Sequence, residues 1–269
     1  MNDAPIQLGG PCIFCGGNAV AVTVDHCPPK GMFRDKVWPA GYAFPSCEAC
    51  NGDTSDDDLM IAFMAQINPD STNEQRMQGL MYMLQRQRPG ALPSMEFSAI
   101  EARAAARRLG LRPAPGQTYQ EIGIVRVPRE MEAAVSTFAA KLSKAVYFKQ
   151  TGKVFPADGG IMMTWFTNAQ RIQNGGVTAL DVLSSLESLS TPKTRNGRDL
   201  QDQFDYRYSQ GEGGELNVLQ AVFGPVFGFA TIFSPTPGMI EGLEDRMKER
   251  MATEKSPFIW VSGTRKQVP

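Results

Sequence analysis

Two pairs of closely spaced cysteines constrain this chain more than any other feature of its sequence. Cys12 and Cys15 form the first pair and Cys47 and Cys50 the second, and two residues separate the members of each pair. Two short turns that each present two thiolates can close a tetrahedral site of the kind that zinc prefers, and the segment between the pairs is long enough to form two strands. We therefore predict a structural zinc ion bound by these four cysteines.

Other uses of the cysteines are weaker interpretations. The fifth, Cys27, is expected to be a small buried side chain, with a catalytic thiol as the alternative. A redox dithiol is disfavoured because the two pairs compete for that role and neither follows an obvious strand of a βαβ unit. Four of the five cysteines fall into the two pairs, which argues for a metal site and against a disulfide framework.

Length and hydropathy indicate an ordinary globular chain. Its 269 residues, 42% of them hydrophobic and 20% charged, are enough for one large or two modest domains. The first ten residues lack the basic and apolar segments of a secretory signal. The longest apolar run, Ala221 to Phe233, is too short and too interrupted by glycine and proline to span a bilayer. We therefore predict a cytoplasmic protein with no membrane partner.

Hydrophobic periodicity divides the chain into a helical middle and a mixed second half. Helical spacing is found at about residues 57–68, 77–84 and 94–109, and strand patterns alternate with helices from Tyr119 onward. We predict an α+β fold with a zinc finger over residues 1–70, a helical connector over 71–116 and a larger mixed α+β domain of unknown role over 117–269. Its predicted strands are 122–125, 161–166, 204–208, 216–223, 226–233 and 258–261, and its predicted helices are 129–149, 179–189 and 239–251.

The segment between the cysteine pairs contains the only histidine of the chain, His26, preceded by Asp25. Hydrolysis of a phosphodiester needs a base that activates water and a cation that neutralises the phosphate. If the two cysteine pairs share one zinc, Asp25 and Asn51 could hold a magnesium ion through oxygen ligands. His26 could then take a proton from water near neutral pH.

The order of these residues resembles the HNH, or ββα-metal, nucleases, most closely the zinc-bearing endonuclease VII type. The resemblance covers about the first fifth of the chain. It implies a treble-clef finger, His26 as the general base, and Asp25 and Asn51 as ligands of a catalytic Mg²⁺ or Mn²⁺. It also implies a structural zinc on the four paired cysteines. The segments that carry it are Asp25-His26-Cys27-Pro28-Pro29-Lys30 and Pro45-Ser46-Cys47-Glu48-Ala49-Cys50-Asn51.

The chain departs from that family in two places. No asparagine occurs between Cys27 and Ser46, where relatives carry the side chain that braces the histidine loop. No histidine follows the second cysteine pair, where many relatives carry another metal ligand. Ser55 stands four residues after Asn51, and the sequence offers Asp53 or one of the aspartates at 56 to 58 as a substitute.

Arginines on the third predicted helix are the candidates for contacting a polyanion. Arg103, Arg107 and Arg108 lie along this helix, whereas residues 1–60 carry an excess of acidic side chains. A nucleic acid must then be held from outside the finger. We predict that these three arginines bind phosphates, and a solvated helix face is the equally strong alternative.

Two functions are compatible with these features. The first is a metal-dependent endonuclease that acts on nucleic acid, DNA more than RNA, with His26 as general base. The second is a catalytically silent zinc-finger adaptor that binds nucleic acid or protein, since zinc sites often serve only to stabilise small domains. A zinc site that only stabilises a small domain has no need for an Asp-His pair, so the nuclease is the preferred prediction. The sequence leaves the oligomeric state open.

Overall fold

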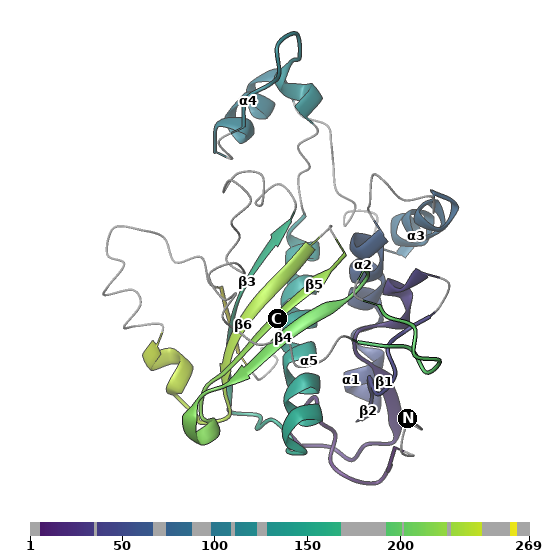
Figure 1. Ribbon diagram of the computed structural model, residues 1–269, viewed down its shortest axis with the longest axis vertical. Coiled ribbons are helices and arrows are strands. Elements are labelled where there is room, and N and C mark those ends of the chain that lie inside the picture. The colour runs from purple at the N-terminus through teal and green to yellow at the C-terminus, as the bar shows by residue number, and fades with distance from the viewer. Residues whose placement is uncertain are drawn as a thin grey trace.

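The structure is a computed structural model that describes residues 6–34, 37–66, 74–87, 98–108, 111–122, 128–167, 192–200, 202–224, 227–243 and 259–262. It contains a small N-terminal hairpin with short helices, a long central helix and a five-stranded sheet. Figure 1 shows the central helix between the sheet and the N-terminal elements. Within the described residues, no helix combines the length and apolar character that crossing a membrane requires.

The central helix, α5 (Arg129–Thr151), organises the fold. Glu130 and Glu132 lie in its first turn, where their negative charges interact favourably with the positive end of the helix dipole and stabilise the helix. Gly152 ends the helix in the left-handed region with φ 70°, and its N–H donates to the Phe148 carbonyl at 2.8 Å. This helix is buried along most of its length because it has neighbours on two sides.

The sheet lies against one side of α5. Its strand order is β4-β5-β6-β3-β7, and every adjacent pair is antiparallel. A buried contact between the hydroxyls of Ser143 in α5 and Thr231 in β6, 2.8 Å apart, joins the helix to the sheet. The strands are β3 (Gly160–Thr167), β4 (Asp205–Gln210), β5 (Asn217–Phe223), β6 (Phe227–Ser234) and β7 (Ile259–Ser262).

The N-terminal finger lies on the other side of α5. Its strands β1 (Thr23–His26) and β2 (Ala43–Ser46) pair antiparallel, and the helix α1 (Glu48–Gly52) follows directly. The finger also approaches the loop after α5 closely. Gly16 has φ 71°, and a Cβ atom there would lie 2.4 Å from the backbone nitrogen of Ala157, so only glycine fits this contact.

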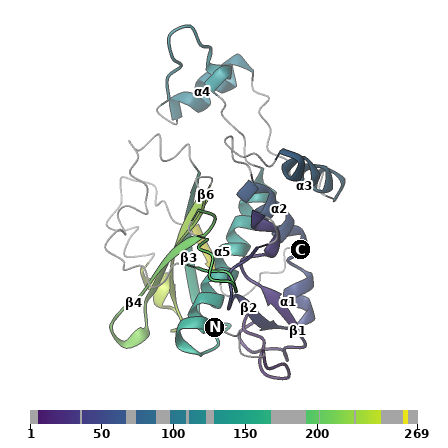
Figure 2. The ribbon, with the colours of Figure 1, turned by 45° about the vertical axis from the view of Figure 1, so that its right-hand side comes forward.

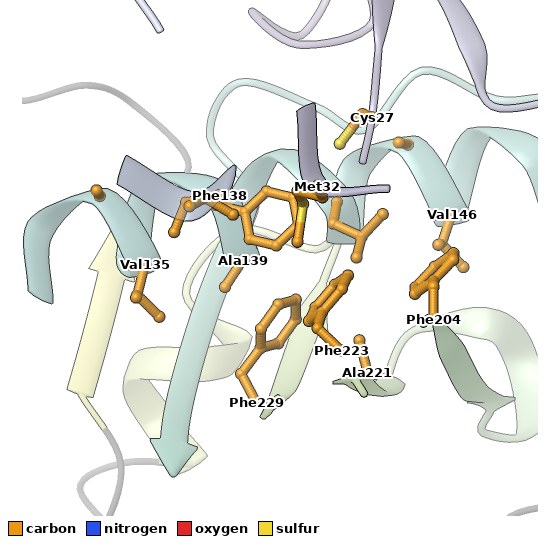
Figure 3. Close-up of a cluster of buried hydrophobic side chains, with 14 of the residues drawn as sticks. Cys27, Met32, Val135, Phe138, Ala139, Val146, Phe204, Ala221, Phe223 and Phe229 are labelled. Carbon is orange, nitrogen blue, oxygen red and sulfur yellow. The ribbon is translucent and has the colours of Figure 1, made fainter. Parts of the chain in front are cut away.

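One cluster of buried side chains joins the finger, α5 and the sheet. Figure 3 shows Phe138 of α5 with Met32 from the finger on one side and Phe223 and Phe229 from the sheet on the other. The ring centroid of Phe138 is 5.2 Å from that of Phe223 and 5.8 Å from that of Phe229. Residues 1–70 and 117–269 therefore contribute to a common core. The predicted boundaries between three domains stay a prediction.

Three further helices connect the finger to α5. The first, α2 (Ser55–Gln66), packs on α5 and on the 3₁₀ helix η1 (Lys30–Met32), where the Gln66 side chain donates to the Met32 carbonyl at 2.6 Å. The second, α3 (Glu74–Gln87), packs on α2. The third, α4 (Ala99–Arg108), lies well away from β1 and β2 in both ribbon views (Figures 1 and 2).

The mixed α+β class predicted from the sequence is confirmed. The predicted strands at 161–166, 204–208, 216–223, 226–233 and 258–261 correspond to β3, β4, β5, β6 and β7. The predicted strand at 122–125 falls mostly outside the described residues, and Tyr119–Ile122 forms a 3₁₀ helix. The predicted helix at 179–189 and most of that at 239–251 also lie outside the described residues.

Candidate functional site

The first cysteine pair lies on a tight turn beside β2. The Cys12 N–H donates to the Ala19 carbonyl at 2.8 Å, and the Gly17 N–H donates to the Cys12 carbonyl at 2.9 Å. The Ile13 N–H reaches the Pro45 carbonyl at 3.3 Å, which places this turn next to the strand that leads into the second pair. Local hydrogen bonds thus shape the first turn, and the bond from Ile13 to Pro45 brings it to the second cysteine pair.

The second cysteine pair marks the start of α1. Cys47 is the N-cap, and its sulfur accepts a hydrogen bond from the Cys50 N–H at 3.4 Å. This hydrogen bond fixes the Cys47 sulfur over the first turn of α1. Cys50 then faces back toward the first pair because it lies one turn further along the helix.

The four sulfurs of Cys12, Cys15, Cys47 and Cys50 lie within 4.8 Å of one another. Sulfurs that bind one zinc at about 2.3 Å lie about 3.8 Å apart, so a small inward adjustment closes a tetrahedral site. Hydrogen bonds from the Cys50 side chain and from nearby backbone groups lower the pKa of Cys12 to about 4. The donor set fits a structural metal ion such as zinc.

The buried lysine Lys144 of α5 lies next to this cluster. Its Nζ donates to the Phe14 carbonyl, between the two cysteines of the first pair, at 2.8 Å. Burial lowers the pKa of Lys144, and the charges of Cys50, Cys15 and Cys12 oppose this shift. A tetrathiolate site with Zn²⁺ carries two net negative charges, so a buried ammonium beside it reduces the cost of that charge.

A second buried lysine of α5, Lys141, occupies the position beside Asp25. The Lys141 Nζ is 2.7 Å from Asp25 Oδ2 and 3.7 Å from Asp58 Oδ2, and it donates to Thr54 Oγ1 at 2.7 Å. The side chains of Lys141 and Asp25 are only 6% and 4% exposed. Burial raises the pKa of Asp25, although the ion pair with Lys141 opposes that shift.

The surroundings of Asp25 do not fit the divalent cation that the resemblance implies. Magnesium holds its oxygen ligands at about 2.0–2.1 Å and retains several waters, whereas Asp25 is almost inaccessible and already paired with an ammonium group. In the part of the chain that the structure describes, no second group of three acidic, cysteine or histidine side chains is compact enough to hold a metal. The structure therefore assigns Asp25 a structural ion pair.

His26 lies on the opposite face of the hairpin from Asp25. Strand residues alternate faces, and the outer positions of β1 and β2 are only half-buried. The imidazole packs edge-to-face on Trp38 with ring centroids 6.0 Å apart. Partial burial lowers the pKa of His26, and the charges of Lys30 and Arg195 lower it further. At neutral pH the imidazole is therefore neutral and can accept a proton.

Asn51 lies in α1 and contacts β1. Its Nδ2 donates to Thr23 Oγ1 at 3.1 Å and to the Val24 carbonyl at 3.4 Å. These bonds fix α1 against the strand that carries Asp25 and His26. The observed contacts give Asn51 a positioning role, and the predicted metal ligation by Asn51 stays a prediction.

The predicted phosphate-binding arginines are remote from His26. Arg103 and Arg107 are exposed on α4, and Arg103 also lies 6.0 Å from the Tyr119 ring. Arg108 ends the same helix, and its side chain lies outside what the structure describes. The structure thus does not bring this helix to the histidine, and phosphate binding by α4 stays a prediction.

Sequence reasoning missed Lys141, Lys144 and Arg195. The two lysines lie three residues apart in α5, 116 and 130 positions after the finger residues that they contact, Asp25 and Phe14. Their positions on one face of the helix would have suggested a common neighbour. Arg195 lies in a polar loop with no pattern of its own. No protein-family model matches this chain, and comparisons with curated proteins and with solved structures gave no match.

Proposed function

We propose that the chain is an endonuclease that hydrolyses phosphodiester bonds of nucleic acid, DNA more than RNA, on a treble-clef ββα finger with a structural zinc. The observation that carries this proposal is the environment of His26. It is half-buried at the end of β1, and this burial, together with the charges of Lys30 and Arg195, lowers the pKa of its imidazole. A neutral imidazole beside positive charge is suited to take a proton from water that attacks a phosphate.

The paired cysteines, Asn51 and His26 have separate roles in this proposal. The zinc, when bound, holds the two cysteine pairs and so fixes the hairpin relative to α1. Asn51 keeps α1 against β1 through its bonds to Thr23 and Val24. His26 removes the proton from the attacking water, and cations near it offset charge on the phosphate. No step is assigned to a second metal ion, because Asp25 is paired with Lys141.

A cleavage assay with a histidine variant tests the proposal. The zinc-loaded chain and its His26→Ala variant would be compared on linear, supercoiled, single-stranded and branched DNA and on RNA, with magnesium, with manganese and with EDTA. Loss of a general base is expected to lower the cleavage rate by about 10²–10⁴-fold. Val22→Ala is the matched control because Val22 lies four residues earlier and is 55% exposed. A wild type that cuts none of these substrates, or a variant that cuts at the wild-type rate, contradicts the proposal.

The second candidate is the catalytically silent adaptor, and the pairing of Asp25 with Lys141 favours it. An HNH nuclease uses this position for its metal, whereas this chain fills it with a buried ammonium. An adaptor predicts nucleic-acid or protein binding that survives both His26→Ala and removal of magnesium. Cleavage that depends on His26 would reject this alternative.

A further inference from the structure

The outer face of the hairpin presents a lysine beside His26. Lys30 begins η1, four residues after the histidine, and its Nζ lies 4.1 Å from the centre of the Trp38 ring. The same ring packs on His26. This cation–π contact holds the ammonium group near the imidazole while leaving the lysine side chain half-buried.

An arginine reaches the same region from a distant part of the chain. Arg195 is exposed on a tight turn, in which the Thr194 N–H donates to the Arg198 carbonyl at 2.9 Å and the Gly197 N–H donates to the Thr194 carbonyl at 2.9 Å. Gly197 has φ 77°, a conformation that this turn requires and that glycine readily adopts. Arg195 is therefore presented by an ordered turn.

Polar contacts fix this turn on the finger. The Ala40 N–H donates to the Lys193 carbonyl at 2.8 Å, two residues after Trp38. Arg34 strengthens the junction through an ion pair with Asp202 and through its backbone N–H, which donates to Gln203 Oε1 at 2.7 Å. In Figure 1 the green segment that leads into β4 lies beside the purple finger. These contacts place the 193–199 turn against the part of the finger that carries Trp38, the residue that packs on His26.

The chemistry of this surface favours a phosphate. The Lys30 ammonium and the Arg195 guanidinium are hydrogen-bond donors with no acceptor, and a neutral imidazole offers one donor and one acceptor. Charged donors form strong hydrogen bonds to phosphate oxygens. The charges of Lys30 and Arg195 both act on the imidazole, so all three groups share one electrostatic environment. A phosphate that approaches this surface is attracted by both positive charges.

We propose that Lys30, Arg195 and His26 form a binding site for one phosphate group of a nucleic-acid backbone. The choice of a nucleic acid over another phosphate source rests on the proposed function. The site itself rests on the contacts that bring the 193–199 turn, Trp38 and His26 together. In this arrangement Arg195 and Lys30 bind the phosphate whose neighbouring water His26 activates.

The single histidine makes the proposal directly testable by NMR. The ring signals of His26 in the zinc-loaded full chain would be followed while inorganic phosphate, and separately a short single-stranded DNA, is added. We expect both ligands to move these signals, and the DNA to bind more tightly than inorganic phosphate. Arg195→Gln and Lys30→Met are each expected to weaken DNA binding by about tenfold. Each should also reduce the slope of log affinity against log salt concentration by the amount that corresponds to about one phosphate contact.

Arg198→Gln is the matched control because Arg198 is an exposed arginine of the same turn. This variant is expected to bind within about twofold of the wild type, since single surface contacts contribute little. The proposal is wrong if the histidine signals do not respond to either ligand, or if Arg198→Gln and Arg195→Gln weaken binding equally. A response to inorganic phosphate with none to DNA would also overturn it, because the site would then bind a free anion.

The outcomes separate this inference from the proposed function. Shifts of the His26 signals with both inorganic phosphate and DNA, without any cleavage by the wild type, would refute the nuclease and retain the binding site. Cleavage that requires His26 but has the same rate and KM in Arg195→Gln would refute the binding site and retain the nuclease.

Discussion

The inner and outer faces of the β1–β2 hairpin differ in almost every physical respect, although they are built from alternate residues of the same two strands. Asp25 on the inner face is 4% exposed and paired with Lys141 of α5. His26 on the outer face is half-buried and lies among Trp38, Lys30 and Arg195. The inner face joins the finger to α5, and the outer face is partly accessible to solvent and to ligands.

This difference shows why adjacent residues in a motif need not share a site. In a strand, successive side chains point to opposite faces, so an aspartate and a histidine in sequence can meet different surroundings. Here α5 covers one face and supplies its cation, which removes Asp25 from the candidate catalytic groups. The comparison also indicates where substitutions should affect stability and where they should affect binding or catalysis.

The largest effect is expected from loss of a zinc ligand, because both faces depend on the same cysteine cluster. Cys47→Ser should abolish binding of one zinc per chain and unfold the finger, since structural zinc contributes about 10 kcal/mol or more to small sites. Zinc content by atomic absorption and thermal unfolding would measure this. Cys27→Ala, a change at a fully buried cysteine outside the cluster, should retain zinc. Equal zinc loss in both variants would contradict the assignment.

The next largest effect should distinguish the two faces directly. Lys141→Met leaves Asp25 buried without its cation and is expected to lower the free energy of unfolding by about 3–5 kcal/mol. Lys30→Met, the same substitution on the outer face, is expected to change it by less than about 1 kcal/mol. Denaturant unfolding of both zinc-loaded variants measures these values. If the two variants were equally stable, the proposed division between the faces would be wrong.

A smaller and pH-dependent effect is expected at Asp58 of α2, whose carboxylate lies 3.7 Å from the Lys141 Nζ. Burial, supported by the charges of Asp25 and Asp57, raises the pKa of Asp58 to about 7 despite Lys141 nearby. An unfolded aspartate has a pKa of about 3.9, so the folded chain binds more protons between about pH 4 and pH 7. The Asp58 contribution to stability therefore falls as pH rises through this window.

Asp58→Asn removes that contribution. The free energy of unfolding of the variant is expected to be about 1–2 kcal/mol higher than that of the wild type at pH 8. This difference should disappear near pH 4, where the wild-type carboxyl is protonated. The side chain is 24% exposed, so the effect should stay below the full value that the pKa difference allows. Denaturant unfolding across pH 4 to 8 provides the measurement. A variant that is less stable at pH 8 would show that the Asp58 charge is needed by Lys141.

Local patterns in the sequence determined much of this protein. The spacing of Cys12, Cys15, Cys47 and Cys50 was enough to predict their cluster, because short turns fix where each thiol points. Alternation of apolar and polar residues was enough to predict β4, and two apolar runs on either side of Gly224 and Pro225 were enough to predict β5 and β6. Each strand and each cysteine pair depends on neighbours within a few residues, and the joining of the two pairs follows from the number of ligands that one metal ion needs. The sequence alone therefore contains the necessary information.

Only the tertiary structure decided what surrounds Asp25 and His26. Lys141 approaches Asp25 from 116 positions further along the chain, and Arg195 approaches His26 from 169 positions further along. Neither approach follows from local periodicity, because each depends on how α5 and the 193–199 turn pack against the finger. The charges that act on a side chain are set by neighbours in space, and for these two residues the neighbours come from the far half of the chain.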